Sequence, residues 1–308
     1  MRRALLLALA AAAEEPPLRV RAFLHAFEGA NPSLRASLGA LCEMERDMGW
    51  TVNATVFAAG DCDGSIDCSY GGARGALAVD VVRFPRSVGA GLAYAHRPAL
   101  LAARGAADVF IVAEDDVVVR AANVVAFLAA AARLPEKYVP GFARYEHLPH
   151  GGDHDEGLAT HASSQGPRRV VSDAPRVVCD SARLWDHDVR DLGGEPCLVL
   201  PRHYAASYAL APAHLAALAA KAPPDFWEIP AAPPESLPRE HAVVDVYWKF
   251  DLVKVIPISL FSASLVQHVR NNAHERHGLR NCPLEAEILA RLARKAGHFP
   301  YAIASNAR

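Results

Sequence analysis

Three consecutive acids, Glu114, Asp115 and Asp116, follow an apolar run, Val109–Val112, and precede a second β-branched run, Val117–Val119. Carboxylates at the end of a buried strand are hard oxygen ligands that suit Mg²⁺ or Mn²⁺ carrying a phosphorylated substrate. Acids in this place also mark turns to solvent, or stabilise the start of a helix through its dipole. The second apolar run favours the metal site, because it predicts that the chain stays extended and holds the acids inside the fold, where unpaired carboxylates need a cation.

Two other groups of polar residues could take part in such chemistry. Gly89 and Gly91 would let backbone N–H groups approach a phosphate, or would simply form a flexible joint between a strand and a helix. His96 and Arg97 follow this joint and are candidates for phosphate or sugar contacts, although a solvated helix face also carries such residues. The loop between His147 and His161 is rich in histidines and acids. Its spacing matches no regular element, so solvated loop residues are the preferred interpretation.

Hydrophobic periodicity predicts the elements that position these residues. Short apolar, β-branched runs predict strands at residues 19–27, 50–58, 79–84, 108–119, 176–180, 197–201 and 204–211, with 252–257 as the last. Amphipathic stretches predict helices at residues 34–48, 123–133, 212–221, 240–248 and 284–295, and a further helix that follows the segment 87–97 and ends at about Arg104. Residues 222–239 are rich in proline and predict a loop. The alternation of strands and helices predicts an α/β fold with a parallel sheet covered by helices.

Composition limits the partners of the chain. It has 308 residues, of which 52% are hydrophobic, and a formal net charge of -2. This length and composition allow one large domain, or two small ones, with a sizeable core. Basic residues are scattered among acids rather than gathered in a block, so neither nucleic acid nor an anionic membrane surface is an expected partner.

The first residues have the layout of a cleaved secretory signal. Arg2 and Arg3 precede an apolar, alanine-rich run, Ala4–Ala13, and a Pro16-Pro17 break follows. This run is too short to span a bilayer comfortably. Residues 1–17 are therefore expected to be a signal peptide, with a short uncleaved anchor or a truncated N-terminus as alternatives.

Cysteine usage fits an oxidising compartment. The chain has six cysteines, and Cys62 and Cys68 enclose a short loop of a kind that disulfides commonly close. Asn53-Ala-Thr55 is an N-glycosylation sequon, although it lies inside a predicted strand. These features predict a protein of the secretory pathway, in the lumen of the Golgi or the endoplasmic reticulum, or a secreted protein.

Together these segments resemble a GT-A type nucleotide-sugar glycosyltransferase. The matching segments are a first strand ending at His25–Glu28, a second ending at Gly60-Asp61, the joint Gly89–Arg97, and the strand ending in Glu114-Asp115-Asp116, in the place of the family's Asp-x-Asp metal motif. Residues 138–146, and 254–258 followed by His268, also look like family segments. The acids read Glu-Asp-Asp, so the family's two aspartates can be placed either on Glu114 with Asp116 or on the adjacent aspartates.

The resemblance implies a Rossmann-like α/β/α sandwich of GT-A type, with a mainly parallel central sheet and an acceptor-side C-terminal portion. The glycosyltransferase domain would span residues 18–275, and residues 276–308 would form a helical tail. A divalent cation, Mn²⁺ or Mg²⁺, would be the cofactor. The partners would be a nucleotide-sugar donor and a carbohydrate, glycoprotein or glycolipid acceptor.

The resemblance also implies roles for individual residues. The metal ligands would be Asp116 as the main ligand, Asp115 or Glu114, and His268. The donor nucleotide would contact His25, Phe27, Glu28, Asp61, Arg97, Glu114 and Asp115. If the enzyme inverts configuration, the base that deprotonates the acceptor hydroxyl would be Asp245 or Glu240. A retaining enzyme would place other demands on that region, so the stereochemistry stays open.

Two other classes of protein would also use this sequence pattern. A secreted metal-dependent phosphohydrolase would need further acids and histidines, which the loop between His147 and His161 could supply by folding back onto Asp116. An inactive carbohydrate-binding module on the same fold would bind sugar without requiring Mn²⁺ or a nucleotide.

Overall fold

A five-stranded sheet lies at the centre of the part of the chain that the structure describes, namely residues 16–27, 32–60, 77–146, 176–177, 187–234, 238–270 and 285–296. In this computed structural model the strands run in the order β11-β4-β1-β2-β3. Their bounds are Arg19–Ala26 for β1, Thr51–Ala59 for β2, Ala78–Phe84 for β3, Val109–Glu114 for β4 and Ser207–Leu210 for β11. The pairs β1–β2, β2–β3 and β1–β4 are parallel, and β11 is antiparallel to β4. The predicted mainly parallel sheet is confirmed.

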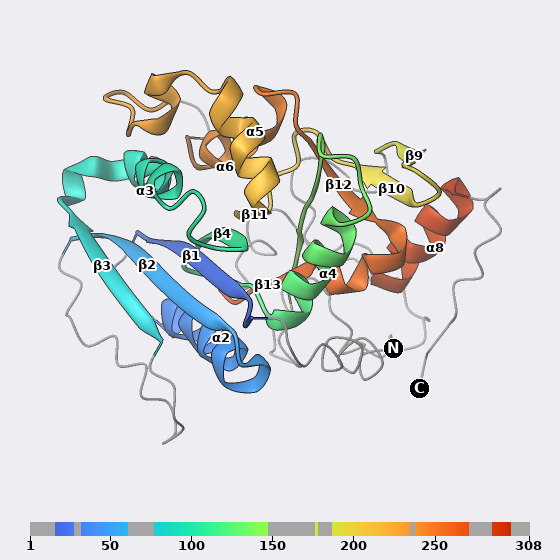
Figure 1. The fold of residues 1–308 in the computed structure, drawn as a ribbon, viewed down its shortest axis with the longest axis horizontal. Coiled ribbons are helices and arrows are strands. Elements are labelled where there is room, and N and C mark those ends of the chain that lie inside the picture. Colours follow the sequence, from blue (N-terminus) through green and yellow to red (C-terminus); the bar gives the residue numbers. More distant parts are fainter. Residues whose placement is uncertain are drawn as a thin grey trace, which may run out of the picture.

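Helices cover both faces of this sheet (Figure 1). Helix α2 (Pro32–Met48) connects β1 to β2 and lies on one face, while the 3-10 helix η1 (Arg86–Tyr94) and helix α3 (His96–Ala102) lie on the other. Helix α2 begins two residues before the expected start, with a proline in its first turn, where the missing N–H costs no hydrogen bond. Its buried face carries Leu34, Leu38, Leu41 and Met44, the spacing from which the helix was predicted.

The order of the strands reverses at β1. After β1 the chain adds β2 and β3 on one side, and it then returns to add β4 on the other side of β1. In doubly wound sheets, ligands bind outside the carboxyl ends of the strands at such a reversal. The carboxyl ends of β1 and β4 carry His25 and Glu114, which are paired in the register of the two strands. The fold therefore places the three acids where a ligand is expected.

Two four-stranded sheets complete the described β-structure, in the orders β6-β12-β10-β9 and β5-β13-β7-β8. The bounds in the first are Tyr138–Pro140 for β6, Val253–Pro257 for β12, Pro196–Val199 for β10 and Val189–Asp191 for β9. Those in the second are Val117–Val118 for β5, Leu265–His268 for β13, Ala143–Glu146 for β7 and Arg176–Val177 for β8. Strand β5 follows the acids directly and pairs antiparallel with β13, with Val117 opposite His268. This pairing brings the C-terminal His268 to the acids.

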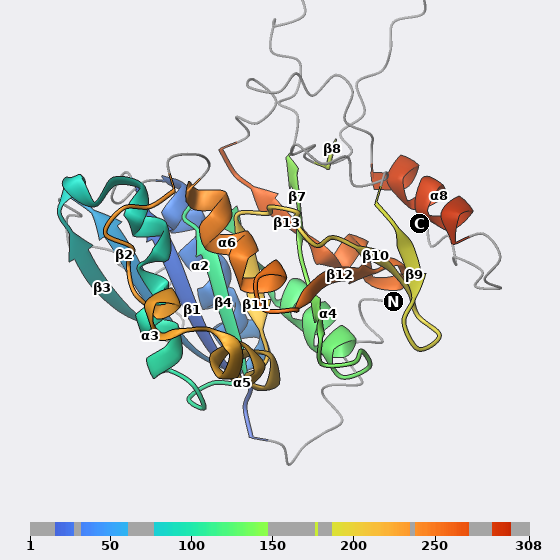
Figure 2. The ribbon, with the colours of Figure 1, turned by 90° about the horizontal axis from the view of Figure 1, so that it is seen from above.

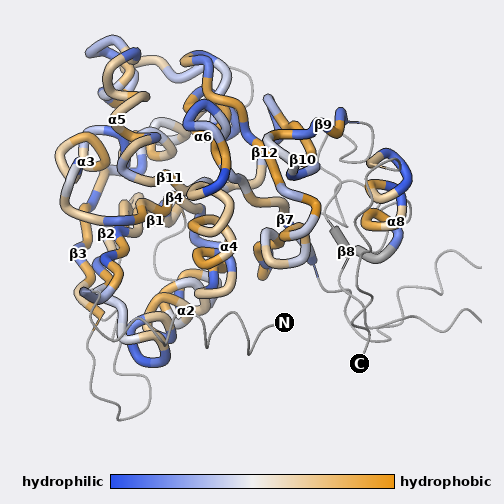
Figure 3. Tube along the Cα trace, turned by 45° about the vertical axis from the view of Figure 1, so that its right-hand side comes forward, coloured by the Kyte–Doolittle hydropathy of each residue, from blue (hydrophilic) through white to orange (hydrophobic). Residues whose placement is uncertain are grey.

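The remaining helices surround these sheets. They are α4 (Ala121–Ala131), α5 (Pro212–Lys221), α6 (Pro238–Trp248), α8 (Glu285–Lys295) and the short 3-10 helices η4 (Pro224–Trp227), η5 (Ile258–Leu260) and η6 (Ser262–Ser264). Figures 1 and 2 place β3 and α8 at opposite ends of the molecule. Hydrophobic and hydrophilic positions alternate around α8 (Figure 3), and Ile288 and Leu292 are buried in a cluster with Leu198 and Ile256. The predicted terminal helix is thus confirmed, and it packs on the sheet that contains β10 and β12.

Three predictions of local structure need correction. The chain does not stay extended from 108 to 119, because it turns at Asp115 and Asp116, and β5 belongs to a different sheet from β4. Strand β12 is not the last, because β13 follows it. The proline-rich stretch at 222–239 is not all loop, because it contains η4 and the start of α6. In the first two cases pairing between distant strands sets the backbone, because β13 pairs with both β5 and β7.

Part of the secretory interpretation lies outside the described residues, including residues 1–15 and the Cys62–Cys68 loop. In the described part of the chain neither Cys42 nor Cys197 forms a disulfide, so that part gives the expected disulfides no support. Burial raises the pKa of Cys197 to about 12, which keeps this thiol protonated. Asn53 of the sequon lies in β2 and is partly buried. Within the described ranges, every helix is too short or too polar to cross a bilayer.

Candidate active site

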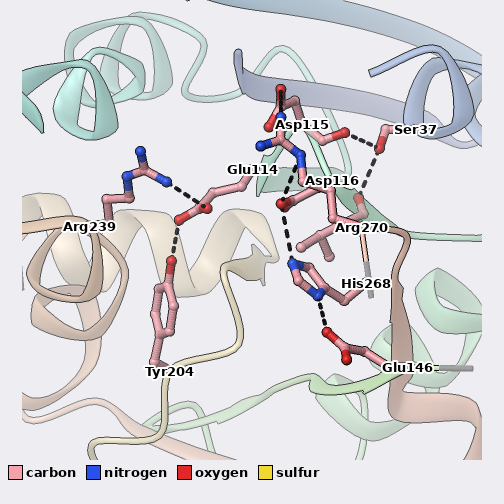
Figure 4. A network of polar contacts seen from close by, with 10 residues as sticks. Ser37, Glu114, Asp115, Asp116, Glu146, Tyr204, Arg239, His268 and Arg270 are labelled. Carbon is pink, nitrogen blue, oxygen red and sulfur yellow. Dashed lines mark hydrogen bonds and ion pairs between the residues drawn. The ribbon is translucent and has the colours of Figure 1, made fainter. Parts of the chain in front are cut away.

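Residues Glu114–Asp116, which we call the acid turn, leave β4 where the strand order reverses. The amide of Asp115 donates to the carbonyl of His25 at the end of β1, at 3.0 Å. The buried hydroxyl of Ser37 on α2 lies 2.9 Å from the carbonyl oxygen of Asp115 and 3.2 Å from that of Val117. The single proton of this hydroxyl is shared between these two carbonyl oxygens, which lie on either side of Asp116 in the chain. The acid turn is therefore fixed by both β1 and α2 (Figure 4).

Asp116 faces His268, the last residue of β13. Asp116 Oδ2 lies 3.2 Å from His268 Nε2, and His268 Nδ1 donates to the fully buried Glu146 at the end of β7. The amide of Val269 donates to the backbone carbonyl of Asp116 at 2.9 Å, which keeps β13 against the turn. The structure thus brings Asp116 and His268 together, the two residues that the resemblance placed in one metal shell.

The charges around this pair favour its ionised form. Burial alone would lower the pKa of His268, but its hydrogen bonds to Asp116 and Glu146 outweigh burial and raise the pKa to about 9. Burial alone would raise the pKa of Asp116, but His268 and Arg270 hold this pKa below its usual value. At neutral pH the pair is an imidazolium between two carboxylates.

These residues fit a divalent cation. Asp116 Oδ1 is buried and has no hydrogen-bond partner among the described residues, an uncommon state for a carboxylate oxygen. Histidines that bind metals usually donate their second ring nitrogen to a carboxylate, as His268 does to Glu146. Bound to a metal, His268 would be neutral, so binding would release a proton.

The number of protein ligands is small. Within the described ranges no group of three or more His, Cys, Asp or Glu side chains surrounds a common point. Mg²⁺ typically takes only one or two carboxylates from the protein and completes its shell with substrate phosphates and water. The pair formed by Asp116 and His268 is therefore suited to a cation that arrives with a phosphorylated ligand.

Glu114 belongs to a second group of contacts on the other side of the turn. The hydroxyl of Tyr204 donates to its carboxylate, and Arg239 Nη1, at the start of α6, lies 3.7 Å from Glu114 Oε2. The guanidinium of Arg239 stacks over the ring of Phe27, 3.7 Å from its centroid. Burial and the neighbouring Asp116 raise the pKa of Glu114. Phe27 and Glu114, both expected to contact the donor, are thus linked through one half-exposed arginine.

His25 lies in a buried network of hydrogen bonds at the end of β1. Its side chain is only 3% exposed, and its Nε2 lies 3.0 Å from Nδ1 of His96, whose Nε2 lies 2.6 Å from the hydroxyl of Tyr208. His25 also donates to the carbonyl of Ala113, so the network assigns neutral tautomers in which Tyr208 donates to His96 and His96 donates to His25. The ring of His25 therefore supports the end of β1 from the core. Its expected contact with the nucleotide stays a prediction, since the ring is buried and both of its nitrogens have partners in this structure.

These buried histidines predict acid-sensitive stability. Burial lowers the pKa of His25 to about 3 and that of His96 well below its usual value of 6.5. Below about pH 6.5 these histidines are protonated in the unfolded chain but stay neutral in the native state. Their contribution to the free energy of unfolding is therefore fully present above that pH, and it is lost as the pH falls towards their pKa values in the native state. Each histidine contributes a slope of about 1.4 kcal/mol per pH unit.

Denaturant unfolding at several pH values between about 4.5 and 5.5 measures this slope. His96→Gln removes one titrating ring, so its slope should be lower than that of the wild type by about 1.4 kcal/mol per pH unit. An equal slope in the two proteins would show that His96 is not held neutral.

Two other predicted site residues lie apart from the acid turn. Arg97 is buried between the rings of Tyr94 and Phe226, at 4.5 and 3.9 Å from their centroids, and donates to the Phe226 carbonyl. In this structure the guanidinium packs α3 against η4, and its expected donor contact stays a prediction. Asp245 is also buried, and Lys249 Nζ and His241 Nδ1 lie 2.6 and 3.2 Å from its two carboxylate oxygens. Both of its oxygens are thus occupied by side chains four residues away, one before it and one after it.

Glu240 lies in the first turn of α6, next to Arg239. Since Arg239 reaches Glu114, this end of α6 borders the acid turn. Glu28, Asp61 and the loop between His147 and His161 lie outside the described residues, so their expected roles stay predictions.

Several residues of the site were not predicted from the sequence. They are Ser37, Glu146, Tyr204, Arg239 and Arg270. Ser37 gave a usable signal, because it is a polar residue on the otherwise apolar face of the predicted helix at 34–48. The others gave none, because strand pairing and loop paths bring them to the acids.

Comparisons with known proteins add little to this geometry. No protein-family model matches the sequence, and no curated protein matches it. Among solved structures, the fold is similar to that of TarS from S. aureus, residues 1–349, at 12% sequence identity and a TM-score of 0.40, over 92% of this chain and 73% of that one. A similarity this distant does not identify the activity.

Proposed function

We propose that this chain is a glycosyltransferase that moves a sugar from a nucleoside diphosphate sugar to a glycan, protein or lipid acceptor, with Mn²⁺ or Mg²⁺ as cofactor. The observation that carries the proposal is the acid turn at the strand reversal, where Asp116 offers a buried oxygen that has no hydrogen-bond partner in the described part of the chain, beside a histidine oriented by Glu146. The proposal rests on this site and not on the distant structural similarity to TarS. The alanine-rich N-terminus supports a further proposal, that the protein works in the secretory pathway.

The donor side of the mechanism follows from the contacts of the acid turn. Asp116 and His268 would hold the cation, which when bound neutralises the charge that grows on the diphosphate leaving group. Glu146 fixes the orientation of the His268 ring. Arg239 is half exposed beside Glu114, where its guanidinium can pair with a phosphate or a ribose hydroxyl at the mouth of the site.

The acceptor side needs a group that removes a proton. As the acceptor oxygen bonds to the anomeric carbon, the bond from that carbon to the diphosphate oxygen breaks, and the hydroxyl proton passes to the base. Glu240 is the better candidate for an inverting enzyme, since it borders the acid turn through Arg239. Asp245 is less suited, because Lys249 and His241 already occupy its carboxylate.

The direct test is a transfer assay with the full chain, a panel of nucleotide sugars and a set of oligosaccharide acceptors, with and without Mn²⁺. Metal-dependent release of one nucleoside diphosphate, with a matching gain of mass on one acceptor, supports the proposal. Release of inorganic phosphate from simple phosphoesters instead would favour the phosphohydrolase. Glycan binding that ignores metal and nucleotide would favour the inactive binding module.

A further inference from the structure

Arg270 bridges the two aspartates of the acid turn. Its Nη2 lies 3.4 Å from Asp115 Oδ2, and its Nε lies 3.5 Å from Asp116 Oδ2 (Figure 4). Its side chain is 25% exposed, whereas those of Asp115 and Asp116 are 4% and 10% exposed. The guanidinium therefore lies at the rim of the site and neutralises carboxylates that are more deeply buried.

We propose that Arg270 is the internal counter-cation of Asp115 and Asp116, and that it couples the binding of the divalent cation to the binding of the donor diphosphate. This inference rests on the proposed function. A dication and a guanidinium beside the same two carboxylates repel one another at short range, and partial burial strengthens that repulsion. The metal alone therefore binds weakly while Arg270 stays in place.

A bound diphosphate would reduce this repulsion between the metal and Arg270. Its oxygens offer the guanidinium a bidentate anionic partner of the kind that arginine binds best. Arg270 stands two residues after His268, beyond the end of β13. Its long side chain can therefore turn from the aspartates to a ligand at the rim while His268 stays fixed by Glu146. The metal and the diphosphate then each favour the binding of the other, by the same factor.

Arg239 makes a useful contrast. It pairs with Glu114 at 3.7 Å and is also held by stacking on Phe27. A guanidinium fixed against a ring loses an attractive contact when it moves. The described ion pairs of Arg270 run to the two aspartates themselves, so it is this arginine whose position competes with the metal.

The test is a Mn²⁺ titration of the full chain, followed by the electron paramagnetic resonance signal of free Mn²⁺, first alone and then with UDP, GDP or ADP. In the wild type we expect one of these nucleotides to tighten Mn²⁺ binding by a factor of about 5–150, the usual range for coupled sites. In Arg270→Gln, Mn²⁺ alone should bind more tightly than in the wild type, on the order of tenfold, and the nucleotide effect should fall towards none.

Two further variants sharpen the test. Arg270→Lys keeps a cation beside the aspartates and should keep most of the coupling. Arg190→Gln removes the same charge at an exposed ion pair with Asp188, and it should bind Mn²⁺ as the wild type does. Circular dichroism verifies that each variant is folded.

Unchanged or weaker Mn²⁺ binding by folded Arg270→Gln overturns the inference. If the wild type still binds Mn²⁺ together with a nucleotide in that case, the proposed function survives and only the coupling is lost. If Arg270→Gln does tighten Mn²⁺ binding but no nucleotide affects any variant, both the coupling and the nucleotide-sugar donor are overturned. Failure of every variant to bind Mn²⁺ would also overturn both.

Discussion

Asp116→Asn is expected to abolish metal-dependent binding of the donor while leaving the protein folded. The substitution keeps the shape of the side chain and an acceptor for His268, but it removes the negative charge and replaces one ligand oxygen by an amide nitrogen without a free lone pair. Transfer should fall by about 10²–10³ or more, the scale seen when one electrostatic contact to the developing charge is lost. Calorimetric titration with Mn²⁺ and the active nucleotide sugar measures the loss of binding.

Asp251→Asn is the matched control for this variant. Asp251 is an exposed aspartate whose backbone φ of 57° lies in the left-handed region, which asparagine also tolerates. The same chemical change is therefore made at a site away from the acid turn, and donor binding should not alter. Donor binding of wild-type strength in Asp116→Asn would remove the central assignment of the metal site.

Glu146→Gln should weaken Mn²⁺ binding by about 10–100-fold, the usual cost of losing a carboxylate behind a metal-binding histidine. Glu146 is fully buried and accepts a hydrogen bond from Nδ1–H of His268. Glutamine preserves the volume and an acceptor oxygen, but it removes the charge that makes the imidazole a stronger ligand. The pKa of His268 should fall as well, because Glu146 is one of the groups that raise it.

Nuclear magnetic resonance of the His268 ring follows that pKa, and the same Mn²⁺ titration gives the affinity. Glu195→Gln is the control, since Glu195 pairs with Arg133 and Ser259 rather than with the acid turn. If Glu146→Gln lowered the pKa of His268 without weakening Mn²⁺ binding, His268 would not be a ligand.

The parts of the fold that follow from local pattern were predictable from the sequence. Strands β1, β2, β3 and β4 and helix α2 each carry their own periodicity, and their alternation implied the parallel sheet. The position of the acids after Val112 also followed, because an apolar run of that length that is rich in β-branched residues favours a buried strand, with a polar edge after it. The reversal of strand order at β1 was not predictable, because which strand pairs with which depends on contacts across the whole chain.

The acid turn shows why the detailed geometry of the site could not be predicted from the sequence. The sequence suggested an extended chain through Asp116 to Val119, since β-branched residues flank the acids on both sides. In the structure Ser37 and Val269 donate hydrogen bonds to backbone carbonyls in and next to the turn. The sequence around residue 116 contains no pattern that predicts either contact. Likewise, Arg97 was expected to contact an anion, but the ring of the nearby Tyr94 and that of Phe226, which is distant in the sequence, bury its guanidinium.

Thermal unfolding of the full chain against a panel of nucleoside diphosphates and nucleotide sugars, with and without Mn²⁺, tests the central claim most directly. A ligand at about 100 times its Kd stabilises the native state by about 2.7 kcal/mol, which a melting curve resolves readily. We expect a rise in Tm that requires both Mn²⁺ and one class of nucleotide, and that disappears in Asp116→Asn. A Tm that no nucleotide shifts, or a shift that persists when EDTA replaces Mn²⁺, would contradict the assignment of a metal-dependent donor site to the acid turn.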